Sequence, residues 1–179
     1  LGIDTILDTG RVSFSQWATL FETNDSTQPA VLADAIKSLR YQKKMGINDV
    51  YQKNGKTPTE VSKAMSSLSI QDTSFDISLL SRQITEAVEI SRDMKTYIAG
   101  SFQFNQKQWL VQKVEYKISN TKLSDFFSPK TKTKTDLIEK IDSFLKNDIR
   151  SLYINTSTIG TSDSIGGMIV ELISTYIID

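Results

Sequence analysis

The chain has 179 residues, of which 39% are hydrophobic and 23% charged, a length and composition that fit one folded domain and exclude a disordered polymer. Its 21 basic residues balance 21 acidic ones, so no strong overall field gathers nucleic acid or anionic lipid. The sequence has no cysteine and no histidine, which excludes disulfides, thiolate or imidazole metal sites, cysteine nucleophiles and Ser-His-Asp triads within this chain.

The N-terminal third predicts three helices separated by polar breaks. Apolar residues at helical spacing follow Ser13 and end at the polar residues 24–26. A second helix begins with Pro29 at its first position and ends at Gly46, because proline is tolerated at a helix start and glycine commonly ends a helix. Residues 57–60, Thr-Pro-Thr-Glu, form a capping box that predicts the start of the third helix.

The middle of the chain carries the strongest helical pattern. Apolar residues recur at helical spacing from Ile77 to Ile98, and Gly100 follows, so we expect one long central helix here. Apolar and polar residues then alternate in residues 101–106 and 109–118, which predicts a β-hairpin. The second of these segments also fits a helix, because its aliphatic residues recur at helical spacing as well.

The C-terminal part begins with residues 128–135, a stretch rich in lysine and threonine that predicts a flexible linker. An amphipathic helix over 137–145 follows, with Thr135 as its N-cap, and residues 152–156 suit a short strand. The last helix starts near Ser162, and its apolar stripe is wide enough to be buried on most sides. This apolar stretch is too short for a membrane span.

These elements predict a mainly α fold, a single domain over residues 1–179. We expect about six helices packed around the 77–98 and 165–177 stripes, with one small β-hairpin, and an α+β fold is the alternative. Leu1 is not an initiator residue, so we expect a processed product or part of a longer chain. A chain without thiols is indifferent to the redox compartment, which leaves the cellular location open.

Glu115 and Lys117 resemble part of a catalytic signature. On a strand, residues two apart point the same way, so a carboxylate and a lysine can face one metal-bound water, as in metal-dependent nucleases. That chemistry also needs an acidic residue at the end of a preceding strand, and residues 102–105 offer none. The alternative is that both residues belong to the solvent face of an antiparallel strand.

Local lysine patches are the candidates for nucleic-acid binding, as in a genome-coating protein. Lys37, Arg40 and Lys44 share one helix face, and Tyr41 beside them offers a ring for stacking on a base. A second group lies in the predicted linker: Lys130, Lys132 and Lys134. The alternatives are a solvated helix face and a flexible connector. The chain has 16 lysines but 5 arginines, which does not favour fork-shaped recognition of phosphate.

The leading hypothesis is a non-catalytic structural or protein-interaction domain, a subunit of a larger assembly. It rests on the absence of histidine and cysteine, the neutral charge and the lack of a convergent catalytic set. We therefore expect no enzyme, no cofactor and no metal site. The expected partner is another protein or a second copy of the chain, and the isoleucine-rich last helix packs partly against it. Nucleic-acid binding is the first alternative and a nuclease the second.

Overall fold

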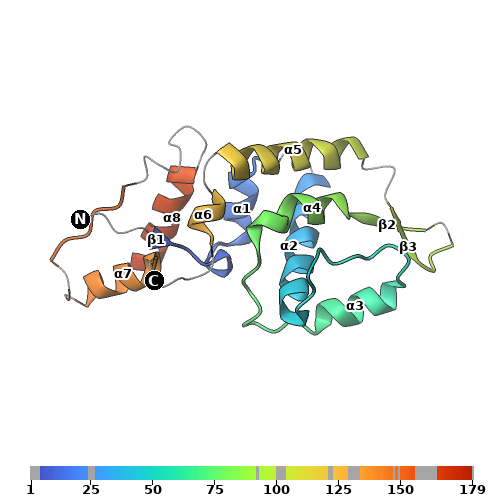
Figure 1. Ribbon diagram of the computed structural model, residues 1–179, viewed down its shortest axis with the longest axis horizontal. Helices are drawn as coiled ribbons and strands as arrows, with labels where there is room; N and C mark the ends of the chain where they lie inside the picture. Colours follow the sequence, from blue (N-terminus) through green and yellow to red (C-terminus); the bar gives the residue numbers. More distant parts are fainter. Residues whose placement is uncertain are drawn as a thin grey trace.

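The computed structural model describes residues 5–23, 27–91, 93–99, 104–120, 123–128, 134–146, 148, 150–155 and 165–178. Across these residues the chain is mainly α, with eight α-helices, two 3-10 turns and two small two-stranded sheets (Figure 1). This confirms the predicted fold class. In Figure 1, α5 lies along one edge above α4 and α2, while α7 and α8 lie at the opposite end from the β2–β3 hairpin.

The first three helices form close to where the sequence predicts them. They are α1 (Phe14–Leu20), α2 (Thr27–Met45) and α3 (Pro58–Ser66). Both α1 and α3 begin with a complete capping box, in which the cap hydroxyl accepts a backbone N–H and a side chain three residues on returns a hydrogen bond. Gly46 ends α2 with a φ of +62°, which favours glycine. Pro29 lies in the first turn of α2 but at its third position, since the helix begins at Thr27.

The long helix predicted over 77–98 is wrong beyond Thr85. The segment forms a 3-10 turn (Ile77–Leu79), α4 (Leu80–Thr85) and an antiparallel hairpin of β2 (Val88–Ile90) with β3 (Tyr97–Ala99). Isoleucine and valine favour strands, and Ser91 closes the turn through its N–H to the Thr96 carbonyl, 2.9 Å. The apolar spacing there is compatible with a period of two as well as with a helix.

The hairpin predicted at 101–118 is also wrong, because the segment forms α5 (Phe104–Asn120). Leu110 and Val114, four residues apart, are fully buried on the side of α5 that packs on α4 and α2. The helical alternative for residues 109–118 is therefore confirmed, residues 104–106 belong to the same helix, and residues 101–103 lie outside the described part of the chain. Among the described residues there is instead one small antiparallel hairpin, formed by β2 and β3.

The C-terminal part closes back on the N-terminus. After α6 (Leu123–Phe126), strand β4 (Thr135–Asp136) pairs in parallel with β1 (Thr5–Ile6) and leads directly into α7 (Leu137–Leu145). The predicted helix is confirmed, but its N-cap is Asp136, which accepts the Ile138 N–H at 2.8 Å, and not Thr135. Residues 152–155 form no strand, contrary to the prediction, and 129–133 and 156 lie outside the described residues.

The last helix, α8 (Ile165–Ile178), is buried on one face rather than on most sides. Met168, Ile169 and Leu172 face the core, whereas other aliphatic residues of the same helix are exposed to solvent: Val170, Ile177 and Ile178. The predicted start near Ser162 lies outside the described residues. No described helix is both long and apolar enough to cross a membrane.

Trp17 lies at the centre of the main core. Its indole is fully buried and packs against three phenylalanine rings, with centroid distances of 5.8 Å to Phe21, 5.6 Å to Phe75 and 5.0 Å to Phe127. Phe21 directly follows α1, Phe75 lies in the loop before the 3-10 turn at 77–79 and Phe127 directly follows α6, so the indole joins three parts of the chain. The same core includes Leu80 of α4 and residues of α7 and α8.

Two buried polar side chains fix loops to this core. The Thr9 hydroxyl accepts the Phe75 N–H at 2.8 Å and donates to the Phe75 carbonyl at 2.9 Å. The Gln83 amide does the same for Tyr51, accepting from its N–H at 2.8 Å and donating to its carbonyl at 2.9 Å. Each side chain therefore satisfies both backbone groups of a buried aromatic residue.

Candidate interaction surface

The predicted cationic face of α2 is largely occupied by contacts within the protein. Lys37 is exposed and Arg40 is half-buried, and burial lowers the pKa of the Arg40 guanidinium. The ring of Tyr41 packs edge-to-face on Tyr51, with centroids 4.8 Å apart. Lys44 donates to the Asp72 carboxylate at 2.8 Å and to the Ser67 carbonyl at 2.5 Å. The four residues thus do not form an open basic patch with a free ring.

Lys44 helps to hold the loop after α3 through Asp72. One oxygen of this carboxylate accepts hydrogen bonds from Lys44, from the Ser69 N–H and from the Ser69 hydroxyl, at 2.7–2.8 Å. These donors stabilise the ionised form and lower the pKa of Asp72 from its ordinary 3.8 to about 2. The side chain of Ile70 projects from this loop and is almost fully exposed.

Acid should therefore remove a stabilising contribution of Asp72. A lowered pKa means that the contribution is complete above the unfolded-state value of 3.8 and is lost as the pH falls towards about 2. We expect Asp72→Asn to lower the thermal midpoint near neutral pH, and the difference from the unsubstituted protein to shrink below that value. Thermal melts across the acid range measure this. A difference that stays constant from neutral pH to the acid end would contradict the assignment.

The second predicted lysine group falls mostly outside the described residues. Lys130 and Lys132 lie there, and Lys134 donates to the Asp125 carbonyl at 3.1 Å and to the Ser128 hydroxyl at 3.3 Å. Lys134 thus joins the end of α6 to the approach to β4. Nucleic-acid binding through either lysine group stays a prediction.

Glu115 and Lys117 lie on a helix, so the strand geometry behind the nuclease hypothesis is wrong. Residues two apart on a helix do not face each other. Glu115 is exposed, whereas Lys117 is 5% exposed and donates to the Glu22 carboxylate at 2.7 Å. The ion pair and its hydrogen bond lower the pKa of Glu22. Among the described residues, no group of three acidic side chains is placed to hold a metal ion.

The lysines of α5 turn towards the protein. Lys107 donates to the Ala87 carbonyl at 3.2 Å, Lys113 to the Glu22 carbonyl at 2.8 Å and Lys117 to the Glu22 carboxylate. Helix α5 therefore uses its cations to bind the loop after α1 and the segment before β2. This is the reverse of an ordinary amphipathic helix, in which lysines face water.

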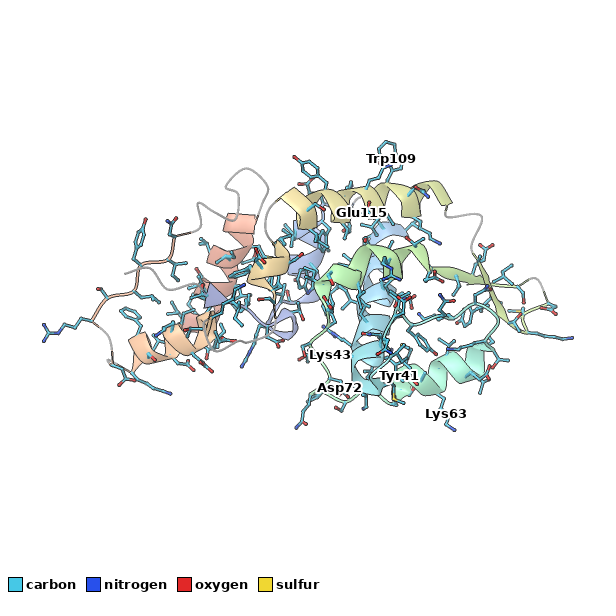
Figure 2. All side chains as sticks on the ribbon, viewed as in Figure 1. Tyr41, Lys43, Lys63, Asp72, Trp109 and Glu115 are labelled. Carbon is cyan, nitrogen blue, oxygen red and sulfur yellow. The ribbon has the colours of Figure 1, made fainter. Side chains whose placement is uncertain are left out.

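The opposite side of α5 presents aromatic rings to solvent. Trp109 is 62% exposed and Tyr116, seven residues later on the same side, is 59% exposed. Figure 2 shows Trp109 pointing away from the body of the molecule and Glu115 on the same helix. We call this surface the α5 outer face and define it by six exposed residues among those whose side chains the structure describes: Gln108, Trp109, Gln112, Glu115, Tyr116 and Ser119. Glu115 is the single formally charged residue of the set.

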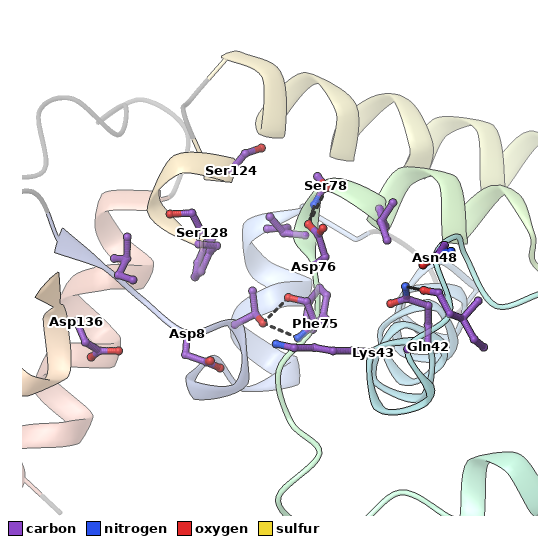
Figure 3. A pocket seen from close by; sticks show the side chains of 17 residues that line it. Asp8, Gln42, Lys43, Asn48, Phe75, Asp76, Ser78, Ser124, Ser128 and Asp136 are labelled. Carbon is purple, nitrogen blue, oxygen red and sulfur yellow. Dashed lines mark hydrogen bonds between the residues drawn. The ribbon is translucent and has the colours of Figure 1, made fainter. Parts of the chain in front are cut away.

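A cavity of about 660 Å³ lies elsewhere, between β1, the end of α2, the 3-10 turn at 77–79 and α6 (Figure 3). Three aspartates reach it, and each already has a structural role. Asp8 accepts the Gly10 N–H, Asp76 accepts from Ser78, and Asp136 caps α7. The carboxylates thus cap helix starts, and the cavity carries no assignment of a ligand.

No protein-family model, curated protein or solved structure matches this chain. The sequence pattern alone does not predict the α5 outer face, because alternation in residues 109–118 favours a strand. A helical period does indicate this face, because Trp109 and Tyr116 lie seven residues apart and therefore on one side, away from Leu110 and Val114.

Proposed function

We propose that this chain is a non-catalytic protein-interaction module, a subunit of a larger assembly, and that it binds a protein partner through the α5 outer face. One observation carries the proposal: α5 leaves Trp109 and Tyr116 more than half exposed while it turns its three lysines inward. Tryptophan and tyrosine are among the residues most enriched at the energetic centres of protein interfaces. Their rings supply large contact area at a low cost in side-chain entropy.

The charge of the face favours a protein over a polyanion as the partner. Nucleic-acid surfaces present cations to phosphates, and aromatic stacking platforms lie in positively charged grooves. On α5 the cations are bound to Glu22 and Ala87, and the exposed charge is that of Glu115. The aromatic pair is flanked instead by glutamine and serine, which suit the polar rim of a protein interface.

Site-specific photo-cross-linking tests this function. A photoreactive amino acid replaces Gln112, between the two rings, and a matched control replaces Lys63, an exposed residue of α3 (Figure 2). In extracts of the source cells, we expect protein adducts from position 112 that are absent from position 63. The adducts should disappear when Trp109 and Tyr116 are both replaced by serine.

Two results would contradict the proposal. The same adducts from positions 112 and 63 would show that the face has no special affinity. Adducts that persist after the double serine substitution would show that the rings do not hold the partner. Circular dichroism of each variant checks that the helix is kept, and exposed substitutions of this kind usually change stability by no more than about 0.5 kcal/mol.

A further inference from the structure

The geometry points to a second copy of this chain as the partner, bound through an antiparallel, two-fold symmetric pairing of two α5 helices. This inference rests on the proposed function and deepens it by naming the partner. A two-fold interface uses the same patch on both subunits, so the patch must be complementary to itself. The α5 outer face meets this condition in the order of its residues and in its charge.

The order of residues along α5 is complementary to itself when one helix is reversed. A two-fold axis near Gln112 places Trp109 of the first copy beside Tyr116 of the second. The same symmetry places Tyr116 of the first copy beside Trp109 of the second. The two aromatic contacts then flank an amide-lined centre, because Gln112 lies between the rings in sequence. Offset or edge-to-face contacts between such rings are favourable beyond the area they bury.

The charges also permit self-pairing. A face with exposed lysines would repel its own copy, but Lys107, Lys113 and Lys117 are bound within the chain. The remaining charge, Glu115, does not meet its equivalent in the reversed arrangement. It lies at a level between Gln108 and Gln112 of the other copy, whose amides can donate to the carboxylate.

The area that two α5 outer faces could bury together is that of a weak, reversible dimer. Each copy exposes on the order of 250 Å² of ring surface at Trp109 and Tyr116, so two copies bury about 500 Å² from the rings. The four polar side chains around them about double this value, which approaches the low end of specific interfaces, about 1,200 Å². We therefore expect association that reverses on dilution.

Sedimentation velocity from low micromolar to near-millimolar protein measures the association. We expect a monomer at the low end and a dimer at the high end, and at least a tenfold weaker association for Trp109→Ser/Tyr116→Ser. The matched control is Val170→Ser/Ile177→Ser on the exposed side of α8, which should dimerise as the unsubstituted chain does.

A charge exchange tests the antiparallel register. Trp109→Asp and Tyr116→Lys should each weaken self-association when present alone. In a mixture of the two variants, the aspartate introduced at position 109 meets the lysine introduced at position 116 across one contact, while the other contact keeps the native rings. Dimerisation should therefore recover. A parallel pairing brings neither combination together, and recovery would then be absent.

The outcomes separate the two proposals. If the chain stays monomeric at near-millimolar concentration, the self-pairing is overturned. It is also overturned if Val170→Ser/Ile177→Ser abolishes dimerisation while Trp109→Ser/Tyr116→Ser leaves it intact. Failure of the mixed variants to recover overturns the antiparallel arrangement. Cross-linking of position 112 to a different protein, in a monomeric chain, would overturn self-pairing and still support the α5 outer face as a docking site.

Discussion

Replacing Trp17 with alanine is expected to lower the free energy of unfolding by about 3–5 kcal/mol, the usual cost of truncating a buried aromatic side chain. The indole is fully buried and contacts Phe21, Phe75 and Phe127, which belong to three separate parts of the chain. Its loss leaves a cavity where these parts meet. Urea unfolding followed by circular dichroism measures the change.

The chain provides a matched control for this experiment, because its other tryptophan is exposed. Trp109→Ala deletes the same indole atoms from a solvent-exposed position and should change the free energy of unfolding by no more than about 0.5 kcal/mol. Trp17→Phe should cost less than Trp17→Ala, since it keeps ring contacts and removes an indole N–H that has no acceptor among the described residues. Equal losses for Trp17→Ala and Trp109→Ala would contradict the placement of the core.

Replacing Thr9 with valine is expected to cost about 2–4 kcal/mol although the shape of the side chain hardly changes. The substitution removes both hydrogen bonds of the buried hydroxyl with Phe75, one to its N–H and one to its carbonyl. Two buried backbone groups lose their partner, and each such group carries a desolvation penalty. Differential scanning calorimetry measures the loss of stability.

Thr175→Val is the matched control for Thr9→Val. The Thr175 hydroxyl donates to the Glu171 carbonyl one turn back on the exposed side of α8, where water can replace it. We expect a change of no more than about 0.5 kcal/mol there. If Thr9→Val proved as mild as Thr175→Val, the loop containing Phe75 would not depend on this hydroxyl.

Local chemistry made much of the fold predictable. Ser13 ahead of an apolar helical pattern, the capping box at Thr57 and the glycine at 46 act within one helical turn, so the sequence alone predicts where α1 and α3 begin and where α2 ends. The amphipathic pattern of 137–145 likewise predicts α7. These signals need no knowledge of distant contacts.

The secondary-structure predictions are wrong in the two segments where a helical and a strand periodicity fit the same residues. Val88, Met94 and Ile98 continue the apolar spacing of the predicted helix. The β-branched residues Val88, Ile90 and Ile98 favour strands, and pairing between β2 and β3 decides the outcome. In residues 109–118, alternation of apolar and polar side chains favours a strand, but burial of Leu110 and Val114 against α4 and α2 favours a helix. Tertiary packing decides both segments, and it is not visible in a local window.

Which residues form the candidate surface depends on whether residues 109–118 form a strand or a helix. As a strand, 109–118 placed Glu115 and Lys117 together. As a helix, it separates them and places Trp109 with Tyr116. The inward turn of the α5 lysines depends on Glu22, more than eighty residues away, and on Ala87. No pattern within α5 itself encodes these partners.

The indole N–H signal of Trp109 gives the most direct test of the α5 outer face. The chain has two tryptophans, so a nitrogen–proton NMR spectrum shows two indole signals, and Trp109→Phe assigns them. We expect the Trp109 signal to exchange with water in dilute protein and to shift and become protected when the protein is concentrated, while the Trp17 signal stays unchanged. A Trp109 indole that stays exposed and unshifted, both in concentrated protein and after addition of an extract of the source cells, would contradict a docking role for this face.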